Sequence, residues 1–355
     1  MKLQENITLS DYTTIRLGGT AKYFCSCASE AELSEALEHA RSNALRVHIL
    51  GGGSNTIFSD NGFDGLIIKV DVKGISIEHE NENVNVSVQG GEDWDSFVAY
   101  CVEHGYAGIE CLSGIPGSVG ATPIQNVGAY GQEVKDSIVR LRLLDRSTLR
   151  KIELSNAECG FSYRNSRFKQ RDAGKYIVTE TTFRLKKNGR PALQYPELKK
   201  ALEAAAPVSS LGEGRESLSL VRNVVISLRR KKSMVIDPAD PNTRSVGSFF
   251  MNPVVTRSEF ERISDRWKAD GDGTVIPSFD AGEKLKVPAA WLIERSGFSK
   301  GMTKNGVGIS DHHSLALVNR GGTAAALMAL AEEIRIRVER RFSLRLEMEP
   351  VIVQS

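Results

Sequence analysis

Two glycine-rich segments are the places in this sequence where the backbone itself could bind a ligand. The first follows a short apolar run at 47–50 and consists of Gly51, Gly52, Gly53, Ser54 and Asn55. Backbone N–H groups of such a turn can surround phosphate oxygens because no side chain obstructs them. The segment lacks the Gly-Lys-Ser/Thr ending of a Walker loop. Taken alone, it indicates a phosphate-binding loop and a purely structural turn equally well.

The second glycine-rich segment covers residues 111–131. Its glycines are Gly114, Gly117, Gly120, Gly128 and Gly131. The first three are evenly spaced, which differs from the G-x-G-x-x-G of a dinucleotide-binding turn. Gln125 and Asn126 carry amides that could hydrogen-bond a heteroaromatic ring. A loop of about 20 residues inside a compact domain is usually functional, so we expect ligand contact here, with an irregular structural loop as the alternative.

A few polar residues stand in patterns that could do chemistry. Arg164 lies in Phe-Ser-Tyr-Arg-Asn-Ser, and Ser248 lies in Gly-Ser-Phe-Phe-Met-Asn-Pro. Alone, the arginine is typical of a solvated surface and the serine of a turn. No G-x-S-x-G turn is present, which disfavours a hydrolase nucleophile. Glu347 and Glu349 alternate with apolar residues, so they share one face of a strand, which matters only if that face lines a cleft.

The histidines and cysteines do not indicate a metal site. His312 and His313 are adjacent, and on a strand adjacent side chains point to opposite faces. Asp311 precedes them. Cys25 and Cys27 share a strand face but have no further ligands nearby in the sequence. We therefore expect that the protein binds no metal.

Periodicity predicts the elements that must position these residues. Ser29 and Glu32 form a capping-box pattern in front of a helix. Further helices are predicted from Trp94 to a stop at Gly105 and at 218–231, 258–267, 288–296 and 323–341. Strands are predicted at 47–50, 65–70, 84–88, 138–144, 151–154, 176–185 and 344–353, and a linker at 205–216. The fold class is α+β, with mixed or antiparallel sheets.

Length and composition limit the possible functions. The chain has 355 residues, enough for two or three domains. With 46 Lys plus Arg and 44 Asp plus Glu, the net charge of +2 gives no electrostatic case for nucleic acid or an anionic membrane. No apolar run is long enough to span a bilayer, and the first residues lack a secretory pattern. Five cysteines at irregular spacing argue against a disulfide framework and predict a cytoplasmic protein.

Together, these motifs resemble the UDP-N-acetylenolpyruvoylglucosamine reductases, the MurB family. The resemblance runs nearly end to end and lies in residues 13–19, 50–58, 114–134, 159–169, 245–255, 286–298 and 312–319. Seven matching segments in the family's order indicate the family far more specifically than any one motif does. Two alternatives remain: another flavin oxidoreductase of the same FAD fold, and a nucleotide-sugar-binding protein without catalysis. The Gly-Ser-Phe-Phe-Met-Asn-Pro and Leu-Glu-Met-Glu-Pro segments argue against the first, and the intact catalytic trio and flavin loop argue against the second.

The resemblance implies a fold and an activity. It implies non-covalent FAD in a two-part fold of the vanillyl-alcohol-oxidase (PCMH-like) type, followed by an α+β substrate domain. The implied domains are 1–72 and 73–204 for FAD, 217–343 for the substrate, and 344–355 for a strand carrying the catalytic glutamate. Hydride would pass from NADPH to flavin N5 and on to C3 of UDP-N-acetylglucosamine enolpyruvate, giving UDP-N-acetylmuramate. A monomer is expected.

The resemblance also assigns roles to residues. Three match catalytic positions: Arg164, Ser248 as the proton donor to C2, and Glu349. The ending differs from the family's Leu-Glu-Pro-Glu-Val, which leaves Glu347 as an alternative to Glu349. The substrate side is matched by Tyr195, Lys232, Asn252 and His313. The FAD side is matched by Gly51, Gly52, Gly53, Ser54, Asn55, Gly114, Gly117, Gly120, Gln125, Asn126 and Gly128.

Overall fold

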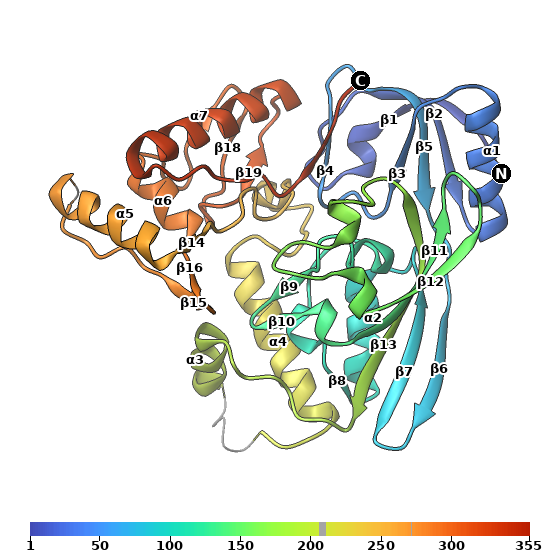
Figure 1. Cartoon of the computed structure of the whole chain (residues 1–355), viewed down its shortest axis with the longest axis horizontal. Coiled ribbons are helices and arrows are strands. Elements are labelled where there is room, and N and C mark those ends of the chain that lie inside the picture. The colour runs from blue at the N-terminus through green and yellow to red at the C-terminus, as the bar shows by residue number, and fades with distance from the viewer. Residues whose placement is uncertain (206–210, 271) are drawn as a thin grey trace. The chain divides into compact units, whose positions relative to one another are not determined.

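The structure is a computed structural model that describes residues 1–205, 211–270 and 272–355. Residues 206–210 of the expected linker lie outside the described residues. The chain forms two compact units (Figure 1). Unit 1 consists of Met1–Thr8, Thr20–Gly53 and Phe63–Val235. Unit 2 consists of Leu9–Gly19, Ser54–Gly62 and Ile236–Ser355.

Unit 1 begins with a mixed four-stranded sheet. Its order is β1 (Gln4–Thr8), β2 (Thr20–Cys27), β5 (Phe63–Val70) and β3 (Val47–Leu50). β1 and β2 are antiparallel, whereas β2, β5 and β3 run parallel. Helix α1 (Glu30–Ser42) buries Leu33, Ala36 and Leu37 and packs on β2 and β5. The expected cap is confirmed, because the Ser29 side chain accepts the N–H of Glu32.

The second sheet of unit 1 is antiparallel. Its order is β12 (Lys151–Ser155), β11 (Ile138–Asp145), β13 (Tyr176–Lys187), β7 (Asn83–Gln89) and β6 (Ile75–Glu80), with β8 (Tyr106–Ala107) paired to β13. The valines of β7 are fully buried in one core with Trp94 and Phe97 of α2 (Trp94–Glu103). The alternation predicted for 84–88 is therefore confirmed.

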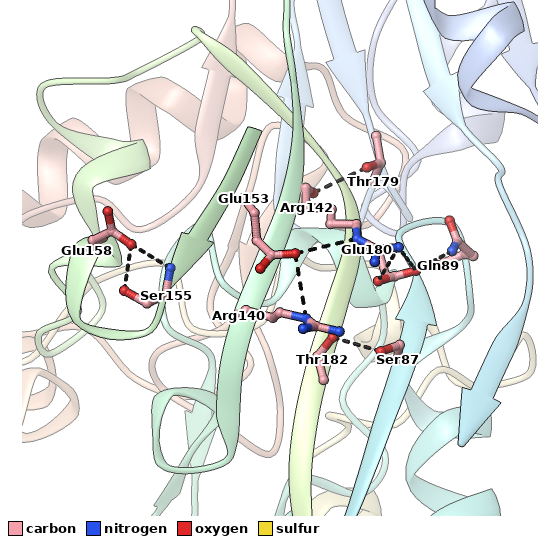
Figure 2. Close-up of polar contacts among 10 residues, drawn as sticks. All are labelled: Ser87, Gln89, Arg140, Arg142, Glu153, Ser155, Glu158, Thr179, Glu180 and Thr182. Atoms are coloured by element: carbon pink, nitrogen blue, oxygen red, sulfur yellow. Dashed lines mark hydrogen bonds and ion pairs between the residues drawn. The ribbon is translucent and has the colours of Figure 1, made fainter. Parts of the chain in front are cut away.

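Polar side chains of β7, β11, β12 and β13 form a group of contacts on this sheet (Figure 2). The buried carboxylate of Glu180 accepts a hydrogen bond from Gln89 at 2.8 Å and pairs with Arg142 at 3.2 Å. Arg140 and Arg142 also approach Glu153, at 3.7 and 3.6 Å. Cross-strand pairs of opposite charge stabilise a sheet.

Two helices complete unit 1. α3 (Pro196–Ala205) and α4 (Arg215–Lys231) pack together around Leu198, Leu202 and Val221. Sequence periodicity did not indicate α3. α4 belongs to unit 1, whereas the expected substrate domain began at residue 217. The difference has a packing cause, because the apolar face of α4 is buried against α3 and α2.

The described residues of unit 2 form three α-helices and short strands. Its helices are α5 (Arg257–Asp270), α6 (Ala289–Arg295) and α7 (Ala324–Phe342). Its antiparallel sheets are β14 (Val254–Thr256) with β16 (Lys284–Lys286) and β15 (Phe279–Ala281), and β17 (Thr303–Lys304) with β18 (Val307–Ile309) and β19 (Leu317–Asn319). β4 (Thr56–Phe58) pairs in parallel with β20 (Val351–Val353). Phe249 and Phe250 lie fully buried in the core.

Two local expectations about unit 2 are wrong. The strand expected at 344–353 is regular only over Val351–Val353, because the residues before it pair through one isolated bridge, Phe250 with Met348. His312 and His313 lie in a bend between β18 and β19 rather than on a strand. The argument from opposite strand faces therefore does not apply to these histidines.

Candidate active site

The two glycine-rich loops touch each other in unit 1. A Cβ on Gly51 would come within 2.5 Å of the Ser118 hydroxyl oxygen, and a Cβ on Gly52 within 2.6 Å of Gly117 Cα. Any side chain at these positions would push the loops apart. Part of the glycine content therefore serves the contact between the loops.

Backbone hydrogen bonds hold the second loop in place. Trp94 N–H donates to Gly117 O at 3.0 Å, and Val119 N–H donates to Glu92 O at 2.8 Å. Gly120 N–H donates to Gly90 O at 2.9 Å. These bonds anchor the loop to the end of β7 and the start of α2. The loop is therefore a preformed part of unit 1.

Asn126 is placed differently from the expectation. Its side chain is fully buried, and its Nδ2 donates to Glu133 Oε2 and to Ser162 O, both at 2.9 Å. Its Oδ1 accepts the N–H of Lys135 at 3.2 Å. Both amide N–H donors are used by Glu133 and Ser162, so this side chain has none to offer a heteroaromatic ring. Gln125, the neighbouring amide, is half-buried.

Arg164 occupies the corner of a tight turn. Ser162 and Asn165 exchange backbone hydrogen bonds at 3.0 and 3.1 Å, which leaves Tyr163 and Arg164 as the turn residues. Arg164 has a backbone φ of +52°, a conformation that residues other than glycine adopt only at a cost in free energy. Its Nη2 donates to Gly128 O at 2.7 Å. The structure thus brings Arg164 to the second glycine-rich loop.

The expected substrate residues of unit 1 lie together. Tyr195 packs edge-on against Tyr130, with ring centroids 5.5 Å apart. Lys232 lies 5.7 Å from the centre of the Tyr130 ring and forms an ion pair with Glu197 at 2.7 Å. Tyr130 and Glu197 were missed by sequence reasoning. The sequence offered one signal for Tyr130, because it is an aromatic residue inside the second glycine-rich loop.

A half-buried arginine, Arg229, completes this cluster. Burial lowers the pKa of Arg229 to about 10, and the nearby charge of Arg164 acts in the same direction. Its Nη2 donates to Met234 O at 2.8 Å. A Cβ on Gly114 would lie 3.4 Å from Arg229 Nε, so glycine leaves room for the guanidinium. Burial also raises the pKa of Tyr130 to about 12. The phenol is therefore neutral and can donate a hydrogen bond.

Unit 2 brings together the other two expected catalytic residues. Glu349 N–H donates to Phe249 O, and Met251 N–H donates to Glu347 O, both at 2.9 Å. This pairing places Ser248 beside the residue that holds Glu349. Ser248 and Glu349 are half-buried, whereas Glu347 is exposed. Asn55 also contacts this strand, since its Nδ2 donates to Glu349 O at 3.3 Å.

The remaining expected residues have visible structural roles. Asn252 Oδ1 accepts the N–H of Ala289 at 2.9 Å and so caps the start of α6. His313 O accepts the N–H of Ala316 at 3.0 Å within the bend before β19. The first glycine-rich segment is divided, because Gly51 to Gly53 belong to unit 1 and Ser54 and Asn55 to unit 2.

The described residues show no metal site and no membrane span. No three His, Cys, Asp or Glu side chains among them gather as a metal ion would require. No helix in the described ranges is both long and apolar enough to cross a bilayer. The described cysteines are buried and free, and the Sγ atoms of Cys25 and Cys27 lie 3.8 Å apart.

Comparison with known proteins identifies the class first. Residues 21–148 match the family described as an FAD binding domain. This range contains the residues of both glycine-rich loops. The second region, 238–353, matches the C-terminal domain of UDP-N-acetylenolpyruvoylglucosamine reductase. The protein is an FAD-dependent oxidoreductase, and the expected α+β fold with an FAD-binding part is confirmed.

Full-length relatives then identify the family. The chain is 47% identical to the UDP-N-acetylenolpyruvoylglucosamine reductase of Thermobifida fusca, over 98% of this chain and 97% of that protein. It is 44% identical to the reductase of the same name from Salinispora arenicola, over 97% and 94%. The chain belongs to the UDP-N-acetylenolpyruvoylglucosamine reductase family. The crystal structure of such a reductase (MurB) from Thermus caldophilus shares the fold, with a TM-score of 0.66 at 21% identity over 99% of both chains.

Proposed function

We propose that the chain reduces the enolpyruvyl ether of UDP-N-acetylglucosamine enolpyruvate to the lactyl ether of UDP-N-acetylmuramate, with NADPH as the reductant. Near full-length identity to reductases of this name supports the proposal. The structural observation that carries it is the backbone hydrogen bond from Glu349 N–H to Phe249 O, which joins the segment of Ser248 to the C-terminal segment of Glu349. When bound, FAD supplies the hydride transfer from NADPH to the terminal carbon of the enolpyruvyl group.

The chain's own residues handle charge and protons. Hydride addition leaves carbanion character beside the substrate carboxylate, and Arg164 offers a planar cationic fork that suits this group. The Ser248 hydroxyl then protonates the adjacent carbon, which is basic enough to accept a proton from a weak acid. Glu349 assists if its carboxyl carries a proton or acts through a neighbour, because two anions side by side repel.

The nucleotide part of the substrate is bound by other groups. Lys232, Tyr195, Asn252 and His313 are the proposed contacts. Lys232 now pairs with Glu197 at 2.7 Å, and a diphosphate is a stronger anion that can replace this carboxylate. Such remote binding energy helps orient the reacting group.

We also propose that the enzyme works as a cytoplasmic monomer. The buried, free cysteines of the described chain suit a reducing compartment. Near-zero net charge gives no reason for attachment to a membrane or to nucleic acid.

The spectrum of the purified protein tests the activity. Bound oxidised flavin should absorb near roughly 370 and 450 nm, and denaturation should release it. NADPH should bleach the 450 nm band, and the enolpyruvyl substrate should restore it without oxygen. A protein that stays colourless with added FAD, or a reduced flavin that the substrate does not reoxidise, would overturn the proposal.

Stopped-flow absorbance of the two half-reactions tests the role of Ser248. Ser248→Ala should leave bleaching by NADPH near the normal rate and slow reoxidation by substrate by roughly 10²- to 10⁴-fold. Ser248→Cys should recover part of the rate, because a thiol can also donate a proton. If Ser248→Ala slows both half-reactions equally, Ser248 shapes the flavin pocket and another group delivers the proton.

A further inference from the structure

The turn that carries Arg164 is attached to the second glycine-rich loop by side-chain hydrogen bonds. Ser166 Oγ donates to Ile124 O at 2.5 Å, and Arg164 Nη2 donates to Gly128 O at 2.7 Å. Asn126 Nδ2 donates to Ser162 O at 2.9 Å. These bonds lie before, within and after the turn. The position of Arg164 therefore depends on the loop.

Asn126 is itself held from three directions. It is fully buried, its second N–H donates to Glu133 Oε2 at 2.9 Å, and its Oδ1 accepts Lys135 N–H at 3.2 Å. Glu133 is paired with Lys135 Nζ at 2.6 Å. A site that needs two donors and an acceptor on one short planar group suits an amide and rejects both carboxylate and methyl. The amide is thus a rigid link between the loop and Ser162.

Arg164 needs such a link because its backbone is strained. A non-glycine residue at φ of +52° keeps this conformation only where the surroundings enforce it. Ser162, whose carbonyl Asn126 binds, is the residue that opens the turn and closes it against Asn165. Without the link, the turn is free to relax, and the guanidinium moves away from its place at Gly128 O.

We propose that Asn126 is a positioning residue for Arg164. It holds the Arg164 turn in the left-handed conformation through Ser162 and does not touch the substrate. This inference rests on the proposed role of Arg164 at the substrate carboxylate. Substitution of a purely structural residue would lower the affinity for all ligands alike. Substitution of a positioning residue lowers the affinity only for ligands that carry the group that Arg164 recognises.

Equilibrium binding separates these two roles. Titration calorimetry should use oxidised holoenzyme with two ligands: UDP-N-acetylmuramate, which carries the lactyl carboxylate, and UDP-N-acetylglucosamine, which lacks it. Loss of one charge-assisted pair is worth roughly 10- to 100-fold in affinity. Arg164→Ala should weaken the first ligand by about this factor. Asn126→Ala should weaken it roughly 5- to 20-fold and leave UDP-N-acetylglucosamine within about twofold.

A double-mutant cycle and a matched control complete the test. Adding Asn126→Ala to Arg164→Ala should cost little more, because the group it positions is already absent. Asn319 is the control, since it is a buried asparagine of unit 2 whose Nδ2 also donates to two backbone oxygens, Ile15 O and Arg16 O. Asn319→Ala should leave both affinities unchanged. Glu133→Ala removes the second anchor and should give a smaller loss of the same kind.

The possible failures are distinguishable. Equal weakening of both ligands by Asn126→Ala, or full additivity in the cycle, overturns the positioning role. If Asn126→Ala does not fold, Glu133→Ala decides, and an unchanged affinity for UDP-N-acetylmuramate overturns the inference. If Arg164→Ala itself leaves that affinity unchanged, the proposed role of Arg164 fails, and the inference about Asn126 fails with it.

Discussion

At the scale of single residues, the candidate site depends on groups placed where water and free rotation are limited. Arg164 sits in a strained turn, Arg229 is half-buried, and the segments of Ser248 and Glu349 are joined by a backbone hydrogen bond. Fixed groups cost no reorganisation when charge develops on a substrate. Small changes at these residues should therefore alter rates much more than they alter folding.

Glu349 and Glu347 provide a matched comparison. Glu349 is half-buried and its N–H donates to Phe249 O, whereas the Glu347 side chain is exposed two residues earlier. We expect Glu349→Gln to slow substrate-driven reoxidation of the flavin by roughly 10²-fold, and Glu347→Gln to leave it near normal. Stopped-flow absorbance measures both. The reverse result would assign the catalytic role to Glu347.

His48 should make stability depend on pH. Burial, with help from the charge of Arg146, lowers the pKa of His48 from 6.5 to about 4. As the pH falls, His48 is therefore protonated in the unfolded chain before it is protonated in the folded protein. The stability contributed by neutral His48 is full above about pH 6.5 and falls as the pH drops toward 4. His48→Gln should remove up to about 3 kcal/mol of this loss. Urea unfolding curves between these pH values measure it, and an unchanged pH slope in the variant would contradict the prediction.

At the scale of elements, one carboxylate connects two helices and a glycine-rich loop. Asp95 at the start of α2 accepts two hydrogen bonds from Arg222 of α4, at 2.6 and 2.9 Å, and the N–H of Gly114 at 2.5 Å. Burial acts to raise the pKa of Asp95, but Arg222 and Gly114 outweigh it, so the net shift is downward. The helices and the loop are thus fastened at one point.

Asp95→Ala should therefore reduce both stability and flavin retention. We expect a loss of about 2–4 kcal/mol, because Arg222 is left partly buried without its partner, together with weaker FAD binding. Asp93→Ala is the control, since the Asp93 side chain caps α2 by accepting Ser96 N–H and its loss should cost about 1 kcal/mol without affecting FAD. Chemical unfolding and flavin fluorescence measure the two effects. Equal effects of both variants would show that capping alone explains them.

At the scale of the whole molecule, FAD should act as part of the folded state of unit 1. Both glycine-rich segments fall in the FAD-binding region at 21–148. A ligand that binds only the folded state stabilises it by about 2.7 kcal/mol at one hundred times its dissociation constant. The melting temperature should thus fall when FAD is removed and rise again with added FAD.

Hydrogen exchange locates this effect. Amides of residues 51–53 and 114–128 should gain protection on FAD binding, whereas those of α7 in unit 2 serve as the internal reference. Protection that is equal throughout the chain, or absent from both loops, would contradict the placement of the cofactor. The same measurement on apoprotein reports whether the loops stay ordered without FAD.

The sequence by itself determined the family, the FAD-binding part, most helices and the candidate residues, because glycine loops, helix periodicity and the Gly-Ser-Phe-Phe motif are local patterns. Local patterns could not show the buried side-chain amide of Asn126, the left-handed turn at Arg164 or the ion pair between Lys232 and Glu197. Each joins residues that are 35 or 36 positions apart. The same reason explains why α4 packs in unit 1 and why the C-terminal segment pairs only in part. Packing across the whole fold determines which side chains and strands become neighbours, and only the tertiary structure shows this packing.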